Sequence, residues 1–517
     1  MIASSRARRR GALTIPAGGW ALCLLLAAPR AVAAQPAPRP LSLAEALRLA
    51  AGSSEQVALA RAGEQRARGQ QAQARSALLP QVATTLNWQR QLQNQFAAAA
   101  GRGGNAGGGA GGGAGADSVA DNPITRIFAS PYNLNIGVTA TQPLYTGGRA
   151  VAGVRSARAA RDAALIGITS AEAQLQLDVT SAYYDALLAE RLATIADSAF
   201  VQAERTLRQV QLTRNVGSAS EFDLIRARVT RDNQRPSLLQ ARTQRDLALV
   251  RLRQLLDLPA SEPVMLTDSI ADASTDAPRS DSGPITTVNV DATQVLAADP
   301  RVTGDVARLV ASTDTSAPAR AAVRQAQKNV EIARETLKAT KGSRLPQLSA
   351  QTVYQRLAPT STFLPTNLND FLPNWTVGIG LSMPLFSGGN LRGQIMAAEA
   401  GVVEARQRLK LAEEGATLDA RQATLQLTEA EASWQASIGT AEQAKRAYEI
   451  AEVRFREGIS TQLELSETRV QLQQALANRA RAARDLQVAR KRLELLPYLP
   501  LSQSAPQAAS TNPGTSR

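Results

Sequence analysis

The sequence contains TQPLYTGGRA at residues 141–150 and SMPLFSGGNL at residues 382–391, which share a proline, a leucine, an aromatic residue and a pair of glycines. The two copies lie 241 residues apart, and Gly217 and Gly458 keep the same offset. In each copy, 69 residues separate the second glycine of the pair from the later single glycine. Shared spacing over such a distance predicts two structurally equivalent halves.

These repeated segments are predicted to be joints between strands and helices. A proline cannot donate a hydrogen bond to a β-ladder, and a glycine pair lets the chain turn sharply before a helix begins. An earlier proline in each half is expected to mark the passage from a helix into a strand. The predicted joint residues are Pro80, Pro143, Gly147, Gly148, Pro346, Pro384, Gly388 and Gly389.

Residues 132–140 and 375–383 alternate apolar with small polar side chains. Period-two alternation predicts strands with one apolar face. Two interpretations follow, which are a half-buried hairpin in a soluble sheet and the lipid-facing strands of a membrane barrel. Two hairpins cannot close a barrel, and lipid does not tolerate open strand edges. A membrane barrel would therefore have to be shared by several copies of the chain.

Apolar residues step by three and four between residues 165 and 210, and alanine fills most of the middle of this series. Such a seam predicts a long helix packed closely against several neighbours. Each half is expected to open with a helical run, at 43–79 and at 319–344. The predicted first repeat spans 34–259, with strands at about 81–92 and 132–142, a long helix at about 149–214 and a return helix at about 219–257. The predicted second repeat spans 316–497, with strands at about 347–356 and 374–384, a long helix at about 390–456 and a return helix at about 460–495.

Four other segments have distinctive compositions. Arginines followed by an apolar run predict a signal peptide at 1–33. The glycine-rich tract at 97–116 is expected to be an insertion at an exposed loop tip. The Ser/Asp/Pro-rich segment 260–315 is expected to link the halves, as an equatorial segment, and 498–517 to be a disordered tail.

The composition excludes several function classes. The chain has no histidine, and its single cysteine, Cys23, lies in the predicted leader. Ser/His/Asp and Cys/His catalysis and His or Cys metal ligation are therefore excluded for the mature chain. Removal of the leader's five arginines lowers the net charge from +14 to +9, and the remaining charge is dispersed. We expect no enzyme activity, no cofactor and no nucleic-acid partner.

The joints, together with VGSASEFDLIRARV at 216–229 and EGISTQLELSETRV at 457–470, resemble the outer membrane efflux protein family, the TolC-like outer membrane factors. The resemblance covers nearly all of 40–258 and 319–497. It implies a mainly α fold with membrane β: a homotrimer with a shared twelve-stranded β-barrel and a long α-helical tube in the periplasm.

The resemblance also implies a function and partners. The chain would be a passive exit duct in the outer membrane for small molecules or proteins, in a tripartite efflux or type I secretion system. An inner-membrane transporter of the RND, ABC or MFS type would supply the energy, and a periplasmic adaptor would dock on the helical turns. The implied docking residues are Val216, Gly217, Ser218, Gly458, Ile459 and Ser460.

Family members often carry acids six and nine residues after the second turn glycine, where this chain has Glu464 and Glu467. The corresponding residues of the first half are Asp223 and Arg226. Residues three apart share a helix face, so a trimer would form two carboxylate rings that favour cations. The alternative is a solvated charged face, and no metal site is certain. Ser460 replaces a latch arginine of the family, so the gate chemistry must differ.

A second function class stays open from the sequence, which is a surface-exposed structural or adhesive coiled-coil protein without a channel.

Overall fold

The computed structural model describes residues 39–92, 130–217, 220–259, 262–269, 308–309, 311–360, 363–365, 367, 369 and 371–501. The predicted signal peptide and the glycine tract lie outside the described residues, as do Ser218 and most of the predicted linker.

The first half contains helices α1 (Leu43–Ser53), α2 (Glu55–Ser76), α5 (Arg149–Asn215) and α6 (Glu221–Leu255). The prediction of one helical run at 43–79 was wrong, because Ser54 adopts an extended backbone between α1 and α2. Its hydroxyl accepts a hydrogen bond from the Val57 amide at 3.4 Å, so Ser54 caps the second helix. Helix α6 continues through Pro236.

The second half contains the short 3₁₀ helix η2 (Ala317–Ala319) and helices α8 (Ala321–Gly342), α9 (Asn390–Arg456) and α10 (Gln462–Leu495). Helices α5 and α9 have 67 residues each. At 1.5 Å per residue each is about 100 Å long. Within the described residues, no helix combines the length and the apolar character needed to cross a membrane.

Four antiparallel strands form one sheet in the order β2-β3-β5-β6. Strand β2 spans Gln81–Arg90 and β3 spans Tyr132–Tyr145, three residues beyond the predicted end. Strand β5 spans Gln347–Thr360, four residues beyond the predicted end, and β6 spans Leu372–Ser382. The first strand of each half lies beside the second, and the two hairpins join between β3 and β5. Strands β2 and β6 are left at the edges.

A second, two-stranded sheet was not predicted from the sequence. Strand β1 (Arg39–Leu41) pairs in parallel with β4 (Val264–Leu266). Strand β4 lies in the segment 260–315, which was predicted as a linker and equatorial segment, so part of that segment packs against the first half.

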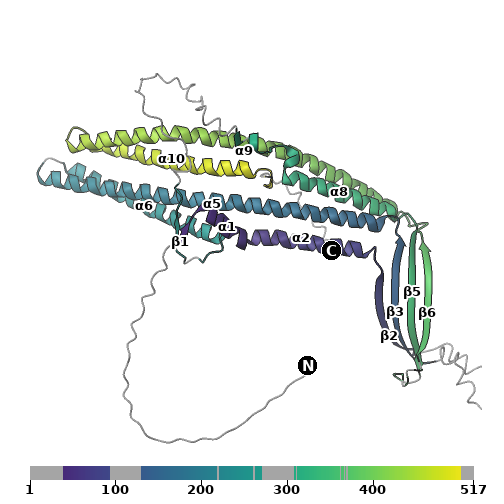
Figure 1. The fold of residues 1–517 in the computed structure, drawn as a ribbon. Coiled ribbons are helices and arrows are strands. Elements are labelled where there is room, and N and C mark those ends of the chain that lie inside the picture. Colours follow the sequence, from purple (N-terminus) through teal and green to yellow (C-terminus); the bar gives the residue numbers. More distant parts are fainter. Residues whose placement is uncertain are drawn as a thin grey trace, which may run out of the picture.

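Figure 1 shows the helices as one elongated body with the four-stranded sheet at one end and both helical turns, α5–α6 and α9–α10, at the other. Helix α5 packs against α6 along one stretch and against α1 and α2 along another, and α9 packs in the same way against α10 and α8. Each long helix thus runs beside two shorter ones. Helix α8 also packs against α5, which connects the halves.

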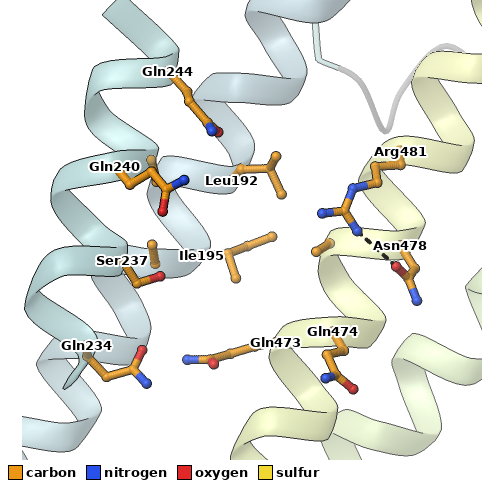
Figure 2. Close-up of a pocket in the computed structure, with 13 residues that line it drawn as sticks. Leu192, Ile195, Gln234, Ser237, Gln240, Gln244, Gln473, Gln474, Asn478 and Arg481 are labelled. Carbon is orange, nitrogen blue, oxygen red and sulfur yellow. Dashed lines mark hydrogen bonds between the residues drawn. The ribbon is translucent and has the colours of Figure 1, made fainter. Parts of the chain in front are cut away.

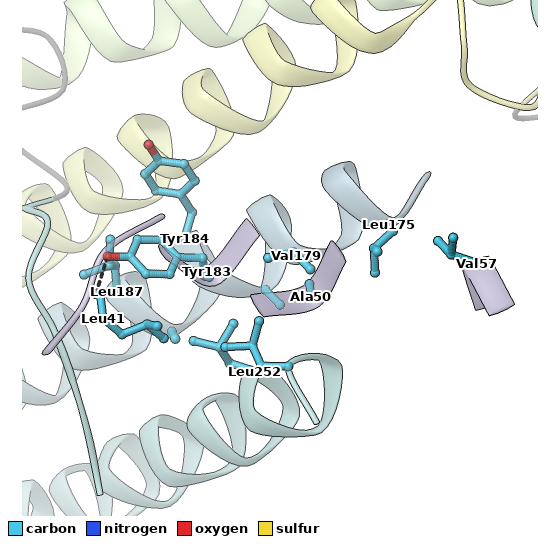
Figure 3. Close-up of a cluster of buried hydrophobic side chains, with 13 residues drawn as sticks. Leu41, Ala50, Val57, Leu175, Val179, Tyr183, Tyr184, Leu187 and Leu252 are labelled. Carbon is cyan, nitrogen blue, oxygen red and sulfur yellow. Dashed lines mark hydrogen bonds between the residues drawn. The ribbon is translucent and has the colours of Figure 1, made fainter. Parts of the chain in front are cut away.

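The main core of the first half lies where β1, α1, α5 and α6 meet (Figure 3). Tyr183 is fully buried there, and its hydroxyl is 3.0 Å from the Leu41 carbonyl oxygen and 2.8 Å from a carboxylate oxygen of Asp268. Burial, assisted by that carboxylate, raises the pKa of the Tyr183 hydroxyl well above its ordinary value.

The second half is fixed by a buried ionic group. Arg320 is fully buried and donates to Asp419 at 2.5 Å, and Arg492 donates to the other carboxylate oxygen at 3.1 Å. Near the C-terminal end of the described chain, Leu499 is buried against Ala173 and Leu495. The prediction that a disordered tail begins at residue 498 was therefore wrong, because the chain is packed up to at least Leu499.

Candidate functional site

The glycine pairs lie at the starts of both long helices. Gly147 and Gly148 have φ angles of +61° and +80°, and Gly388 and Gly389 have φ angles of +58° and +85°. These left-handed conformations strain residues that carry a Cβ. Gly148 and Gly389 are the N-caps of α5 and α9. Each pair thus turns the chain from the sheet into a long helix.

One of these joints connects the two halves. A Cβ on Gly147 would lie 2.3 Å from the Gly342 carbonyl oxygen, and a Cβ on Gly342 would lie 2.4 Å from the Gly147 carbonyl oxygen. No atom lies within 4 Å of a Cβ built on Gly388, the equivalent of Gly147. The sequence comparison missed Gly342, because the second joint has no glycine in the corresponding place.

The prolines occupy three kinds of position. Pro80 and Pro346 directly precede β2 and β5, and Pro384 lies two residues after β6. Pro143 was predicted to end its strand, and this was wrong, because β3 continues through it to Tyr145 with a register shift. Strand β2 begins opposite Thr141, so at Pro143 only the β5 edge of β3 is paired. The missing amide hydrogen is tolerated at such a place.

The register of the sheet separates an apolar face from a polar face. Rows of paired residues such as Leu86–Ile136 alternate with rows such as Thr85–Gly137–Gln355–Asn374. Neither face is covered by another layer of the described chain (Figure 1). Exposed apolar surface of this size marks an interaction or membrane surface. The large exposed side chains of the apolar face are Val82, Leu86, Trp88, Ile136, Val138, Tyr354, Trp375, Val377, Ile379 and Leu381.

The first helical turn begins at Val216 and Gly217, which has a φ of +81°. Ser220 caps α6 by accepting a hydrogen bond from the Asp223 amide at 3.1 Å. The Asp223 carboxylate in turn accepts from the Ser220 amide at 3.2 Å and from its hydroxyl at 2.6 Å. This entrance candidate is thus engaged in a capping box. Arg226 lies half-buried one turn further on.

The second helical turn also contains a glycine, but its hydrogen bonds differ from those of the first turn. The carbonyl of Arg454 accepts hydrogen bonds from the Ile459 and Ser460 amides, at 2.8 and 3.2 Å, across Gly458. The Ser460 hydroxyl oxygen is buried without a partner. Glu464 forms an ion pair with the Arg454 side chain at 3.5 Å. Ser460 thus lies near Arg454, whose side chain is already paired with Glu464.

Glu464 and Glu467 differ in their surroundings. Glu464 is half-exposed and paired with Arg454, whereas Glu467 is exposed on the next turn of the same helix. Because Glu464 is held in an ion pair, Glu467 is the freer of the two carboxylates. The gating and docking roles of these residues stay predictions.

The two turns are packed against one another. Phe455 packs against two apolar clusters, one in each helical hairpin. The cluster of the first hairpin includes Leu207 and Val210, and that of the second includes Leu465 and Leu472. The side-chain amide of Gln462 lies 3.1 Å from the Asp223 carbonyl oxygen and from the Ala227 nitrogen, in the orientation that satisfies both. The two turns therefore form one surface.

Val216 and Ile459 of that surface were predicted from the sequence, whereas Phe222 and Leu463 were missed. Val216 is 79% exposed and Ile459 is 69% exposed, at the turns themselves. Phe222 and Leu463 follow in the first turns of α6 and α10 and are also exposed. Apolar residues directly after a helix cap, outside the buried seam, were the available signal. Exposed apolar side chains at the end of a rod favour a protein-docking surface.

A polar cavity of about 570 Å³ lies between α5, α6 and α10 (Figure 2). Arg481 is its only charged lining residue and donates to Asn478 at 3.1 Å. No carboxylate or nucleophile activated by a base faces it, so its lining groups do not support acid–base or covalent catalysis. Its other polar lining residues are Gln234, Ser237, Gln240, Gln244, Gln473 and Gln474.

A second cavity, of about 530 Å³, is lined by the carboxylates of Glu55, Asp178 and Asp185. Asp178 accepts from Gln174 at 2.8 Å, and burial raises the pKa of its carboxyl. Asp185 is paired with Arg484 at 2.8 Å. These groups are satisfied within the helical body. Among the described residues, no group of three or more acidic side chains is arranged to hold a metal ion.

Comparisons with known proteins agree with this architecture. The model of the family described as outer membrane efflux protein matches residues 46–257 and 316–496, which are most of both halves. The pyoverdine export outer membrane protein OpmQ of Pseudomonas putida is 26% identical over 333 residues. The match spans 63% of this chain and 63% of that protein, so it covers less than two thirds of the relative.

Solved structures show the same fold. The CmeC channel of Campylobacter jejuni superposes with a TM-score of 0.65 at 14% identity, covering 89% of this chain and 87% of that chain. VceC of Vibrio cholerae gives a TM-score of 0.61 at 16% identity, covering 88% and 95%. The open state of MtrE from Neisseria gonorrhoeae also gives 0.61 at 16%, covering 88% and 89%. The predicted TolC-like fold is confirmed, and the chain belongs to the outer membrane efflux protein family, whose members are channels of the outer membrane rather than enzymes.

Proposed function

We propose that three copies of this chain form a passive duct across the outer membrane and that their helices continue the duct into the periplasm. The observation that carries this proposal is the four-stranded sheet, which has an apolar face and two unpaired edges, β2 and β6. Lipid does not tolerate open edges, so β6 of one protomer must pair with β2 of the next. Three such sheets give a twelve-stranded barrel.

The duplicated helices support the same assembly. Helix α8 packs against both α5 and α9, whereas the main partner of α2 is α5 alone. Because the halves are equivalent, the side of α9 left open is the place where α2 of a neighbouring protomer would lie. The empty surroundings of Gly388 fit this arrangement, since Gly342 fills the corresponding space beside Gly147.

The exposed apolar end of the rod supports docking by a periplasmic adaptor at Val216, Gly217, Ser218, Gly458, Ile459 and Ser460. The adaptor would connect the duct to an inner-membrane transporter of the RND, ABC or MFS type. Transport through the duct would need no chemistry from this chain. A relative named for pyoverdine export supports a small-molecule cargo over a protein cargo.

Electrical conductance of the purified chain in a planar lipid bilayer tests the duct. We expect discrete openings from the detergent-solubilised complex. A bilayer that stays silent, while the protein is shown to be inserted, would favour the alternative of a structural or adhesive coiled-coil protein without a channel.

A further inference from the structure

Two arginines interrupt an otherwise uncharged sheet. Strands β2, β3, β5 and β6 contain Arg90 and Arg356 and no other charged residue. In particular, the four strands contain no aspartate and no glutamate.

Both arginines lie on the apolar face. Arg90 pairs with Tyr132, and Arg356 pairs with Ile136 on one side and with Pro373 on the other. Side chains of directly paired residues point to the same face of a sheet, and every second residue along a strand does so too. Arg90 and Arg356 therefore share the face of Trp88 and Tyr354 rather than the polar face that would line a channel.

The arginines lie toward the end of the sheet that is farther from the helices. Leu348, opposite Tyr145, marks the near end of the apolar face, and Arg356 follows eight residues later. Eight residues of a strand tilted by about 40° rise about 20 Å, and the apolar band of an outer-membrane barrel is about 25 Å tall. Arg356 thus lies near the outer boundary of the band, and Arg90 lies beyond it.

Aromatic rings surround this region. Trp88 lies 5.8 Å from the Tyr132 ring and 5.0 Å from the Phe363 ring, between ring centroids. Such rings concentrate where a barrel passes from lipid tails to headgroups. The Arg90 guanidinium lies 5.6 Å from the Tyr132 ring centroid, and the Arg356 Nε donates to the Tyr354 hydroxyl at 3.0 Å.

Neither arginine has a counter-charge in the part of the chain that the structure describes. Within that part of the chain, no ion pair involves Arg90 or Arg356, and both side chains are exposed. A guanidinium facing lipid is unfavourable at the bilayer centre and is tolerated near the interface, where an anion can reach it. Among the described residues, the positive charges of Arg90 and Arg356 are therefore not balanced by an acidic side chain.

We propose that Arg90 and Arg356 bind phosphate groups of an anionic glycolipid in the outer leaflet of the membrane. A planar guanidinium binds a phosphate through two parallel hydrogen bonds. The two arginines are two strands and four residues apart, which is about 16 Å, so each would bind a phosphate of its own. The apolar side chains below them would contact the acyl chains. The proposal rests on membrane insertion of the sheet and not on conduction.

Native mass spectrometry of the detergent-solubilised protein, titrated with diphosphoryl lipid A, tests the proposal. We expect the double variant Arg90→Gln with Arg356→Gln to bind this lipid about tenfold more weakly, because both charge-assisted contacts are lost. Arg228→Gln, on an exposed residue of α6 at the other end of the rod, also removes a positive charge and should leave binding unchanged. Arg356→Lys should retain binding within about threefold, since it keeps the charge and loses the planar fork.

Two further probes distinguish the source of the phosphate. Dephosphorylated lipid A should bind the wild type as weakly as diphosphoryl lipid A binds the double variant, and inorganic phosphate should not displace the bound lipid at equal concentration. Equal lipid binding by the wild type and the double variant would overturn the proposal. Equal binding of the dephosphorylated lipid, or full displacement by inorganic phosphate, would overturn it as well. Conductance of the double variant reports on the duct separately, so the two proposals can fail independently.

Discussion

Gly147 and Gly342 are in direct backbone contact, and a Cβ on either residue would overlap the carbonyl oxygen of the other, at 2.3 and 2.4 Å. Gly147 lies two residues before α5, the long helix of the first half, and Gly342 is the last residue of α8 in the second half. The contact therefore holds the two halves of the chain together at the place where the sheet meets the helical body.

Substitution of either residue should weaken this joint. We expect Gly147→Ala and Gly342→Ala to destabilise the folded chain strongly, because backbone atoms must move apart. Gly148→Ala is the matched control, since Gly148 also has a positive φ of +80° but has no atom within 4 Å of its Cβ. Its left-handed backbone alone should cost about 1 kcal/mol. Thermal unfolding in detergent, followed by circular dichroism, measures all three, and equal losses would contradict a specific contact.

Tyr183→Phe should change how stability depends on alkaline pH. The folded state raises the pKa of Tyr183, so folding favours the protonated hydroxyl. That stabilisation is complete below the unfolded pKa of about 10 and is lost as the pH rises above it. The wild type should therefore lose up to about 1.4 kcal/mol more per pH unit above 10 than the variant does.

At neutral pH the same variant should be less stable by about 1 kcal/mol, because a buried hydrogen bond is removed. Tyr498→Phe, on a ring that is 47% exposed, controls for the loss of a hydroxyl. Parallel pH curves for the wild type and Tyr183→Phe would show that this tyrosine does not titrate with folding.

The entrance acids lead to a prediction about cation block. If Glu464 and Glu467 form carboxylate rings, the double variant Glu464→Gln with Glu467→Gln should weaken the block of conductance by divalent cations. The double variant Glu442→Gln with Glu449→Gln removes two charges further up the same hairpin and should leave block unchanged. Block that is the same in all three proteins would exclude the entrance role.

The exposed apolar side chains of the turns should determine adaptor docking. We expect Phe222→Ser with Ile459→Ser to reduce copurification of the periplasmic adaptor at least about tenfold, because buried apolar anchors dominate such interfaces. Leu247→Ser is the control, since Leu247 is also exposed, at 63%, but lies on α6 far from the turns. Loss of adaptor in the control, or retention in the double variant, would place docking elsewhere.

Local patterns in the sequence were sufficient to predict the strands and the long helices. Period-two alternation around Ile136 and the alanine-rich series around Val179 each reflect one local geometry. The core tyrosine Tyr183 was missed, because it lies outside the series used to trace the seam, beside Ala182. Strand β4 was missed because three residues pairing with β1, more than 200 positions away, leave no periodic signal.

Joint and site residues were predictable only in part. Glycine pairs with positive φ follow from a local turn, whereas the Gly147–Gly342 contact requires the packing of two halves. Asp223 was identified by its distance from a glycine, but that distance says nothing about its capping box with Ser220. The passage of β3 through Pro143 depends on where β2 begins, which is a property of the whole sheet.

The mass of the detergent-solubilised complex tests most directly whether the barrel is shared. Native mass spectrometry of the purified chain should show three copies, because only neighbouring protomers can pair the β2 and β6 edges. A stable monomer that conducts, or a monomeric rod that remains in solution without detergent, would contradict the account.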